Sequence, residues 1–129
     1  MTARREPIAT SVAPAAIGPY SQAVKAGGFL HCSGQIGIDA ASGALVSGGV
    51  AAECHQVMKN LGAILAAAGL DWNDVVRTTI YLVRLDDFAV VNDVYAGYLS
   101  TPYPARATVG VAALPKGALL EIDAVARLR

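Results

Sequence analysis

The sequence predicts an α+β chain in which helices cover one face of a mixed β-sheet. The first observation is the order of its periodic segments, which runs strand, strand, helix, strand, helix, strand, strand. The second is the change at Val50 from strand-like patterns to an apolar repeat of three and four residues. The third is the length of 129 residues, which is typical of one domain with a sizeable core. We therefore expect a single domain over residues 1–129, with a flexible tail at residues 1–7.

The N-terminal third predicts a loop followed by a hairpin. Residues 13–24, APAAIGPYSQAV, contain two prolines and a glycine and are typical of a turn-rich loop. Residues 23–39, AVKAGGFLHCSGQIGID, predict two short strands around the Gly27-Gly28 pair. Residues 39–49, DAASGALVSGG, predict a second loop.

The middle of the chain predicts an amphipathic helix and a strand. Apolar residues recur at helical spacing from Val50 and stop at Gly69, which is a common helix terminator; they are Val50, Cys54, Val57, Met58, Leu61, Ile64, Leu65 and Ala68. The β-branched stretch DVVRTTIYLVRL at residues 74–85 predicts a strand.

The C-terminal part predicts one more helix and two more strands. Residues 86–100, DDFAVVNDVYAGYLS, predict a helix with Asp86 or Asp87 as the N-cap. After a break at two prolines, strands are predicted at residues 105–114 and 118–128, with PKG as the turn between them.

The composition indicates a homo-oligomer and argues against nucleic acid or acidic membranes as binding partners. The chain is 54% hydrophobic and only 16% charged, so we expect part of its apolar surface to be covered in a homo-oligomer. The formal net charge of zero argues against nucleic acid and acidic membranes. Two cysteines without CxxC spacing favour a reducing, cytoplasmic setting. The N-terminus has no secretory h-region, and no uninterrupted apolar run could span a bilayer.

Arg106 and Glu121 are the main candidates for chemistry because each lies in a largely apolar segment. A guanidinium can bind a carboxylate with two parallel hydrogen bonds, and a glutamate can activate water. Spacing by itself favours a structural ion pair instead. If the last two strands pair through the PKG turn, one register brings Arg106 and Glu121 near one sheet edge, but the sequence does not fix that register.

The remaining polar candidates are weaker. The histidines beside Cys32 and Cys54 lack chelating spacing, so no metal is expected and both cysteines are expected to be buried. Ser33 has no indicated base and is expected to act as a hydrogen-bonding residue. Tyr20 and Asn92 have no distinctive pattern around them.

Four segments of the chain together resemble the RidA family, and the resemblance runs from about Ile8 to the end. They are APAAIGPYSQAV, CSGQIGID, DFAVVNDVYAGYL and PARATVGVAALPKGALLEIDAVA. The resemblance implies a chorismate mutase-like fold and a homotrimer with sites in clefts between subunits. It also implies hydrolysis of reactive 2-imino or enamine acids to 2-keto acids and ammonium, without a cofactor, which protects pyridoxal-phosphate enzymes.

The resemblance assigns roles by matching position. Arg106 would bind the substrate carboxylate, and Glu121 would hold or activate the attacking water. Tyr20, Ser33, Gly34 and Asn92 match family pocket positions, while the backbone at Ala107 and Thr108 would contact the imine end; these eight residues form the expected site.

Two departures from the family pattern keep other functions open. Many deaminase members have cysteine where Thr108 stands, and the segment YLSTPYPAR is shorter than in the usual deaminases. A binding or protein-protecting module that kept the pocket without turnover is the alternative. Ribonuclease activity is the third hypothesis, and the neutral charge counts against it.

Overall fold

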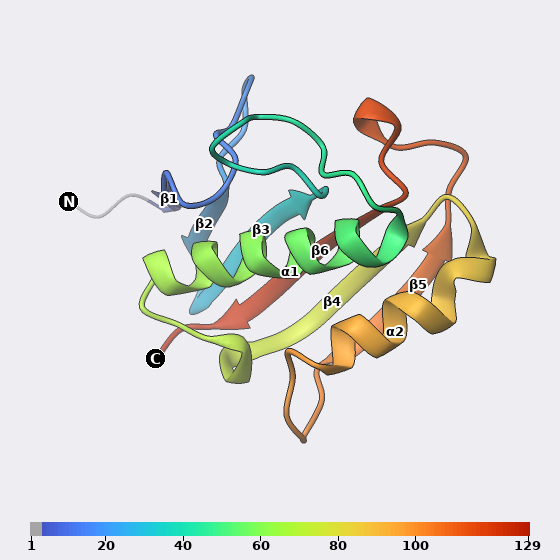
Figure 1. Cartoon of the computed structure of the whole chain (residues 1–129). Helices are drawn as coiled ribbons and strands as arrows, with labels where there is room; N and C mark the ends of the chain where they lie inside the picture. The colour runs from blue at the N-terminus through green and yellow to red at the C-terminus, as the bar shows by residue number, and fades with distance from the viewer. Residues whose placement is uncertain (1–3) are drawn as a thin grey trace.

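The computed structural model describes residues 4–129, and Figure 1 shows a twisted sheet with helices on one face. The helices of this described part are α1 (Val50–Ala67) and α2 (Phe88–Ala96). Its strands are β1 (Glu6–Ile8), β2 (Ala23–Ala26), β3 (Phe29–Gln35), β4 (Val75–Leu82), β5 (Ala105–Gly110) and β6 (Leu120–Arg127). The α+β class, the helices on one face and the order of the predicted segments are confirmed.

Strand pairing differs from the sequence prediction at the C-terminal end of the chain. Within residues 4–129 the sheet has six strands in the order β1-β2-β3-β6-β4-β5. β6 is antiparallel to both β3 and β4, whereas β5 is parallel to β4. The PKG segment is therefore no hairpin turn, because β4 lies between the strands it was expected to join. A parallel pair requires a crossover connection, and α2 supplies it between β4 and β5.

A short first strand was not predicted. β1 pairs antiparallel with β2, with Pro7 opposite Val24. The tail expected at residues 1–7 thus includes two residues of an edge strand, and proline is tolerated at an edge because its missing N–H faces away from the ladder. Residues 1–3 lie outside the described part of the chain.

The predicted α1 is confirmed, and its apolar stripe packs on the sheet. Cys54, Val57, Leu61 and Ile64 are fully buried, and the chain leaves the helix at Gly69 with φ of 76°. α1 lies across β3 and β6 and packs beside α2. Both cysteines are buried and free, as expected, and desolvation raises the pKa of the Cys54 thiol to about 12.

The N-cap of α2 is one of the two residues expected there, but it does not cap the helix with its side chain. Asp87 precedes the first helical residue, but its side chain makes no capping hydrogen bond. A 3₁₀ turn at Leu85–Asp87 leads into the helix instead.

Strand alternation gives the sheet two unlike faces. In β4 and β6 the side chains of Thr78, Ile80, Ile122 and Ala124 are buried under the helices. Glu121 lies between buried neighbours in the sequence and is itself only partly buried, because it points to the opposite, open face. No helix of the described residues is long and apolar enough to cross a membrane.

Candidate active site

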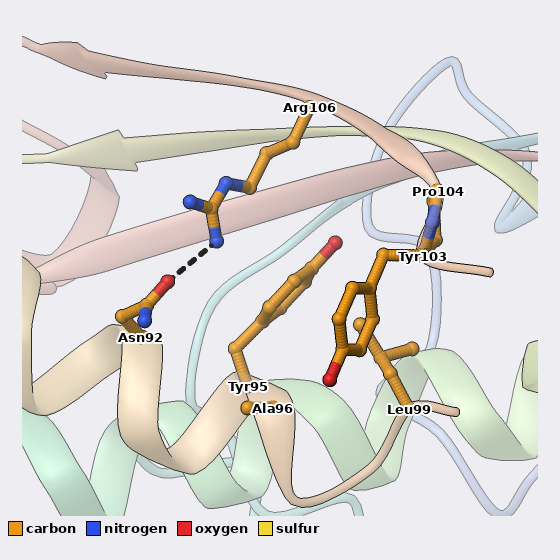
Figure 2. Close-up of a pocket in the computed structure, with 7 residues that line it drawn as sticks. All are labelled: Asn92, Tyr95, Ala96, Leu99, Tyr103, Pro104 and Arg106. Atoms are coloured by element: carbon orange, nitrogen blue, oxygen red, sulfur yellow. Dashed lines mark hydrogen bonds between the residues drawn. The ribbon is translucent and has the colours of Figure 1, made fainter. Parts of the chain in front are cut away.

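Arg106 projects from β5 toward α2, on the helix-covered face of the sheet. In the register of β4 and β5 it lies beside Thr78, whose side chain is buried under α2. Its Nη1 donates a hydrogen bond of 2.8 Å to Oδ1 of Asn92 (Figure 2). The guanidinium carbon lies 5.3 Å from the ring centroids of both Phe88 and Tyr95. Two π faces and one amide therefore hold the guanidinium in place.

Helical spacing on α2 brings these three partners to one side. Phe88, Asn92 and Tyr95 are four and three residues apart, which places them on one helix face. Tyr95 is 4% exposed, and its hydroxyl lies 2.7 Å from Oγ1 of Thr78 in β4. This buried hydrogen bond fixes α2 to the sheet directly behind Arg106.

A pocket opens beside the guanidinium. It encloses about 380 Å³ and is lined by Asn92, Tyr95, Ala96, Leu99, Tyr103, Pro104 and Arg106. In Figure 2 the guanidinium of Arg106 is turned toward Asn92, and the rings of Tyr95 and Tyr103 stand on its other side. The pocket combines one positive group with apolar and aromatic walls, which is suited to a small organic anion.

The structural ion pair that spacing favoured is wrong. Among residues 4–129, Arg106 forms no salt bridge with any carboxylate. Glu121 lies opposite Tyr81 in the β4–β6 ladder, whereas Arg106 lies beside Thr78. Because Thr78 and Tyr81 are an odd number of positions apart on β4, their side chains point to opposite faces, and so do Arg106 and Glu121. The guanidinium is thus available to an external carboxylate.

Glu121 lines a separate pocket on the open face. This pocket encloses about 550 Å³, and Tyr20, Gly34, Lys116 and Glu121 are among its lining residues. Burial raises the pKa of the Glu121 carboxyl above its ordinary value, and the negative charge of Asp123 raises it further. A carboxylate with a raised pKa at a pocket wall is suited to take and return a proton.

Gly34 makes room for that carboxylate. A Cβ atom on Gly34 would lie 2.8 Å from Cδ of Glu121 and would collide with Oε2. Gly34 sits where the β3–β6 register shifts between Cys32 and Gln35. The expected association of Gly34 with the site has a steric basis here.

Tyr20 lines this pocket, and Ser33 precedes the lining residue Gly34. Oγ of Ser33 donates a hydrogen bond of 2.6 Å to the carbonyl of Ser21, as expected for a hydrogen-bonding rather than a nucleophilic serine. The loop that carries Tyr20 is held by buried Gln22, whose Nε2 donates to the carbonyl of Pro14 at 2.7 Å. Tyr20 itself is 51% exposed, so its ring is free to contact a ligand or a neighbouring chain.

Ala107 and Thr108 follow Arg106 along the edge strand. Ala107 faces the open side, and Thr108 faces the helices with its Oγ1 buried and without a hydrogen-bond partner in the described chain. The N–H of Val111 donates to the carbonyl of Leu82. By alternation, the backbone groups of Thr108 point away from β4 toward the free edge.

The eight expected site residues therefore fall into two groups on opposite faces of the sheet, which we call the two half-sites of the expected site. Arg106, Asn92 and Thr108 lie on the helix-covered face, while Glu121, Gly34, Tyr20 and Ser33 lie on the open face or its rim. Ala107 lies on the open face. No group of three or more His, Cys, Asp or Glu side chains within residues 4–129 could hold a metal ion.

Comparison with known proteins places the chain in a family. A family model described as Endoribonuclease L-PSP matches residues 10–128. A human protein named 2-iminobutanoate/2-iminopropanoate deaminase is 55% identical over 122 residues, covering 95% of this chain and 89% of that protein. The crystal structure of RidA from an Antarctic Psychrobacter has 49% identity and a TM-score of 0.92, covering 95% of this chain and 99% of that one. The chain belongs to the RidA family.

A more distant relative of known structure extends this RidA family assignment. E. coli TdcF, whose structure contains bound serine, is 38% identical with a TM-score of 0.89, covering 96% of this chain and 99% of that one. This structural match runs over almost the whole chain, so it includes the residues of both half-sites.

Sequence reasoning missed the aromatic partners of Arg106 in this RidA-family chain. Phe88 and Tyr95 contact the guanidinium, and Tyr103 lines the pocket, but none was expected in the site. The spacing of Phe88 and Tyr95 from Asn92 was a usable signal, because all three share one face of the predicted helix. Tyr103 lies between Pro102 and Pro104 in a loop and carries no such signal.

Proposed function

We propose that this protein hydrolyses reactive 2-imino and enamine acids to 2-keto acids and ammonium. The observation that carries the proposal is Arg106, whose guanidinium lies at a pocket without a carboxylate partner in the described chain. Relatives at 55% and 53% identity, from human and mouse, are named 2-iminobutanoate/2-iminopropanoate deaminase. A 2-imino acid carries the carboxylate that Arg106 is suited to bind.

In the proposed mechanism, Arg106 binds the substrate carboxylate and Asn92 keeps the guanidinium oriented. The protonated imine is already electrophilic, so the protein has to orient it and supply water. Glu121 takes one proton as water adds to the imine carbon and returns it to the nitrogen. As the C–N bond breaks, the remaining hydroxyl proton leaves through Glu121 and passes to the departing ammonia, which becomes ammonium. One iminium acid and one water give one 2-keto acid and one ammonium ion, and the balance requires no metal or cofactor.

The two half-sites meet between copies of the chain in this proposal. Arg106 and Glu121 lie on opposite faces of one sheet, so a substrate held by one chain's Arg106 needs the neighbouring chain's Glu121. A homotrimer with clefts between subunits brings such surfaces together in a closed ring. The free edge of β5, with the outward backbone groups of Thr108, would line the cleft next to the imine.

The proposed role is protection of pyridoxal-phosphate enzymes, which release such imines. We place it in the cytoplasm, because two free cysteines are compatible with a reducing compartment.

The first test is an imine-trapping assay. 2-Iminopropanoate and 2-iminobutanoate are generated with an amino-acid oxidase and trapped by semicarbazide in the presence of protein. We expect the wild type to suppress semicarbazone formation. Arg106→Ala should lower kcat/KM by about 100-fold or more, because a bidentate charged contact contributes roughly 3 kcal/mol. Circular dichroism and size-exclusion chromatography should show an unchanged fold and assembly.

Arg84→Ala is the matched control, since Arg84 is an exposed arginine that only approaches Asp86 at 3.9 Å. It should keep wild-type activity. Absence of suppression by the wild type would reject the deaminase proposal and favour a binding module with the same pocket. Unfolding of Arg106→Ala would make Arg106 a structural residue.

Ribonuclease activity is the second candidate, because the matching family model is described as Endoribonuclease L-PSP. The zero net charge argues against it. RNA cleavage that survives Arg106→Ala would point to a separate site or a contaminant.

A further inference from the structure

Glu53 is a buried carboxylate that the proposed chemistry does not use. It lies in the first turn of α1 and is only 4% exposed. Its Oε1 accepts a hydrogen bond of 2.9 Å from the backbone N–H of Leu119, which is 66 residues away in the chain. A side chain this polar is rarely buried without a structural or functional reason.

The hydrogen bond holds the segment that leads into Glu121. Leu119 precedes β6 by one residue and Glu121 by two. The β3–β6 ladder ends with Gln35 opposite Ile122, so Leu119 lies beyond the last pair on that side. Glu53 therefore accepts a hydrogen bond from the backbone of Leu119, just beyond the point where pairing with β3 ends.

The same turn of α1 also supports the opposite wall of the Glu121 pocket. A Cβ on Gly37 would lie 2.9 Å from Cα of Glu53, so the loop after β3 packs directly on the helix backbone. Asn60, two turns further along α1, donates to the carbonyls of Ile36 and Ile38 at 3.3 and 2.9 Å. Ile36 and Ile38 line the pocket of Glu121.

We propose that Glu53 is a positioning residue for Glu121: its hydrogen bond to Leu119 holds one pocket wall against the helix turn on whose backbone Gly37 of the other wall packs, so that the two walls keep a fixed spacing. Glu53 itself touches no substrate in this arrangement. The expected effect of Glu53 on kcat rests on the deamination proposed above. Its expected effect on the pKa of the Glu121 carboxyl is independent of that proposal.

Two conservative variants separate the effect of side-chain length at position 53 from the effect of its charge. Glu53→Gln keeps an acceptor oxygen at the same distance without the charge, whereas Glu53→Asp keeps the charge but is too short to reach Leu119. The main readout is the Glu121 pKa, measured by carboxyl-carbon NMR titration of the full chain. The other ionisable groups near this carboxyl are Asp123, Tyr81 and Lys116, and none of them is changed.

We expect a raised Glu121 pKa in the wild type and in Glu53→Gln. In Glu53→Asp the carboxyl should become more solvated, and its pKa should fall toward the ordinary value. In the trapping assay, Glu53→Asp should lower kcat by about tenfold with KM within about twofold, because the carboxylate-binding Arg106 lies on the other face. Glu53→Gln should remain within about twofold of the wild type in both constants.

Leu65→Ala controls for general loss of stability. Leu65 is fully buried on the same helix, about 18 Å from Glu53 along the axis. It should lower the unfolding midpoint without changing the Glu121 pKa. The proposal is overturned if Glu53→Asp leaves that pKa unchanged, if Glu53→Gln lowers it equally, or if Leu65→Ala does so. An inactive wild type would reject deamination alone, because the NMR result still decides the role of Glu53.

Discussion

At the residue scale, the Glu121 carboxylate can occupy its position because Gly34 has no Cβ atom. Gly34 does not have the positive φ that favours glycine, so the backbone there accepts alanine. A Cβ atom at this position would nevertheless collide with the end of the Glu121 side chain. The colliding group is the flexible end of a side chain and can swing away. The absent methyl group therefore controls where the carboxylate lies more than whether the chain folds.

Gly34→Ala is expected to reduce deamination without unfolding the protein. Displacing the Glu121 carboxylate by about 1 Å should lower kcat by about 10- to 100-fold, while the free energy of unfolding changes by less than about 1 kcal/mol. Steady-state kinetics and urea unfolding measure the two effects.

Gly62→Ala is the matched control, because a Cβ at Gly62 would meet only Nε1 of Trp72 at 3.5 Å. It lies within α1 and should raise the free energy of unfolding by about 0.5–1 kcal/mol with activity unchanged. Full activity in Gly34→Ala would show that the Glu121 position does not matter for turnover.

At the scale of elements, α2 both connects two parallel strands and carries three side chains that contact Arg106. One helix face presents Phe88, Asn92 and Tyr95 to Arg106. The ring of Tyr95 contacts the guanidinium, and its hydroxyl is hydrogen-bonded to Thr78 in β4. Anchoring and binding are thus performed by different atoms of one side chain, so they can be separated by mutation.

Tyr95→Phe should destabilise the fold while sparing substrate affinity. The variant keeps the ring beneath Arg106 but leaves the buried Thr78 hydroxyl unpaired, at a cost of about 1–3 kcal/mol in unfolding free energy. Combining it with Thr78→Val removes both partners and should recover much of that loss, which a double-mutant cycle in urea measures. A KM raised tenfold in Tyr95→Phe would contradict this division of roles.

At the scale of the whole molecule, one sheet separates the two half-sites. The β4 strand lies between β5 and β6, and side chains leave its two faces alternately. As a result, the described chain holds Arg106 and Glu121 on opposite faces. Catalysis that needs both groups at one substrate then requires two copies of the chain.

Mixed assemblies of two inactive variants should regain activity. We expect the wild type to elute as a trimer of about 40 kDa, three times the 13.2 kDa chain. When Arg106→Ala and Glu121→Ala chains are co-expressed in equal amounts, a cleft is intact only if each side comes from the suitable variant, so about one quarter of wild-type activity should return. Each variant alone should stay inactive. Failure of the mixture to exceed its components would place both groups of a working site in one subunit.

Local pattern was enough for most elements of the fold and for part of the site. Periods of two and of three to four residues depend only on neighbouring positions, so the type and order of most elements and the two faces of β6 could be predicted. The family resemblance placed Arg106 and Asn92 separately among the expected site residues, and the hydrogen bond between them was not predicted. Phe88 and Tyr95 could have been found by the same helical spacing.

Strand order could not be predicted in this way. The PKG segment looks like a hairpin turn by composition, yet the strands on either side of it each pair with β4. That choice depends on which arrangement best buries the apolar faces of all strands under both helices, and no segment carries this information alone. The contacts of Glu53 with Leu119 and of Gly34 with Glu121 depend on the same choice.

The sequence by itself determined the class of fold, the buried helix stripe and the placement of Arg106 and Glu121 in two largely apolar segments, because these are properties of local order along the chain. Only the tertiary structure decided that Arg106 and Glu121 face opposite ways, since this depends on the strand between them. The physical reason is that side-chain direction alternates along a strand, whereas the pairing of strands is set by burial over the whole sheet.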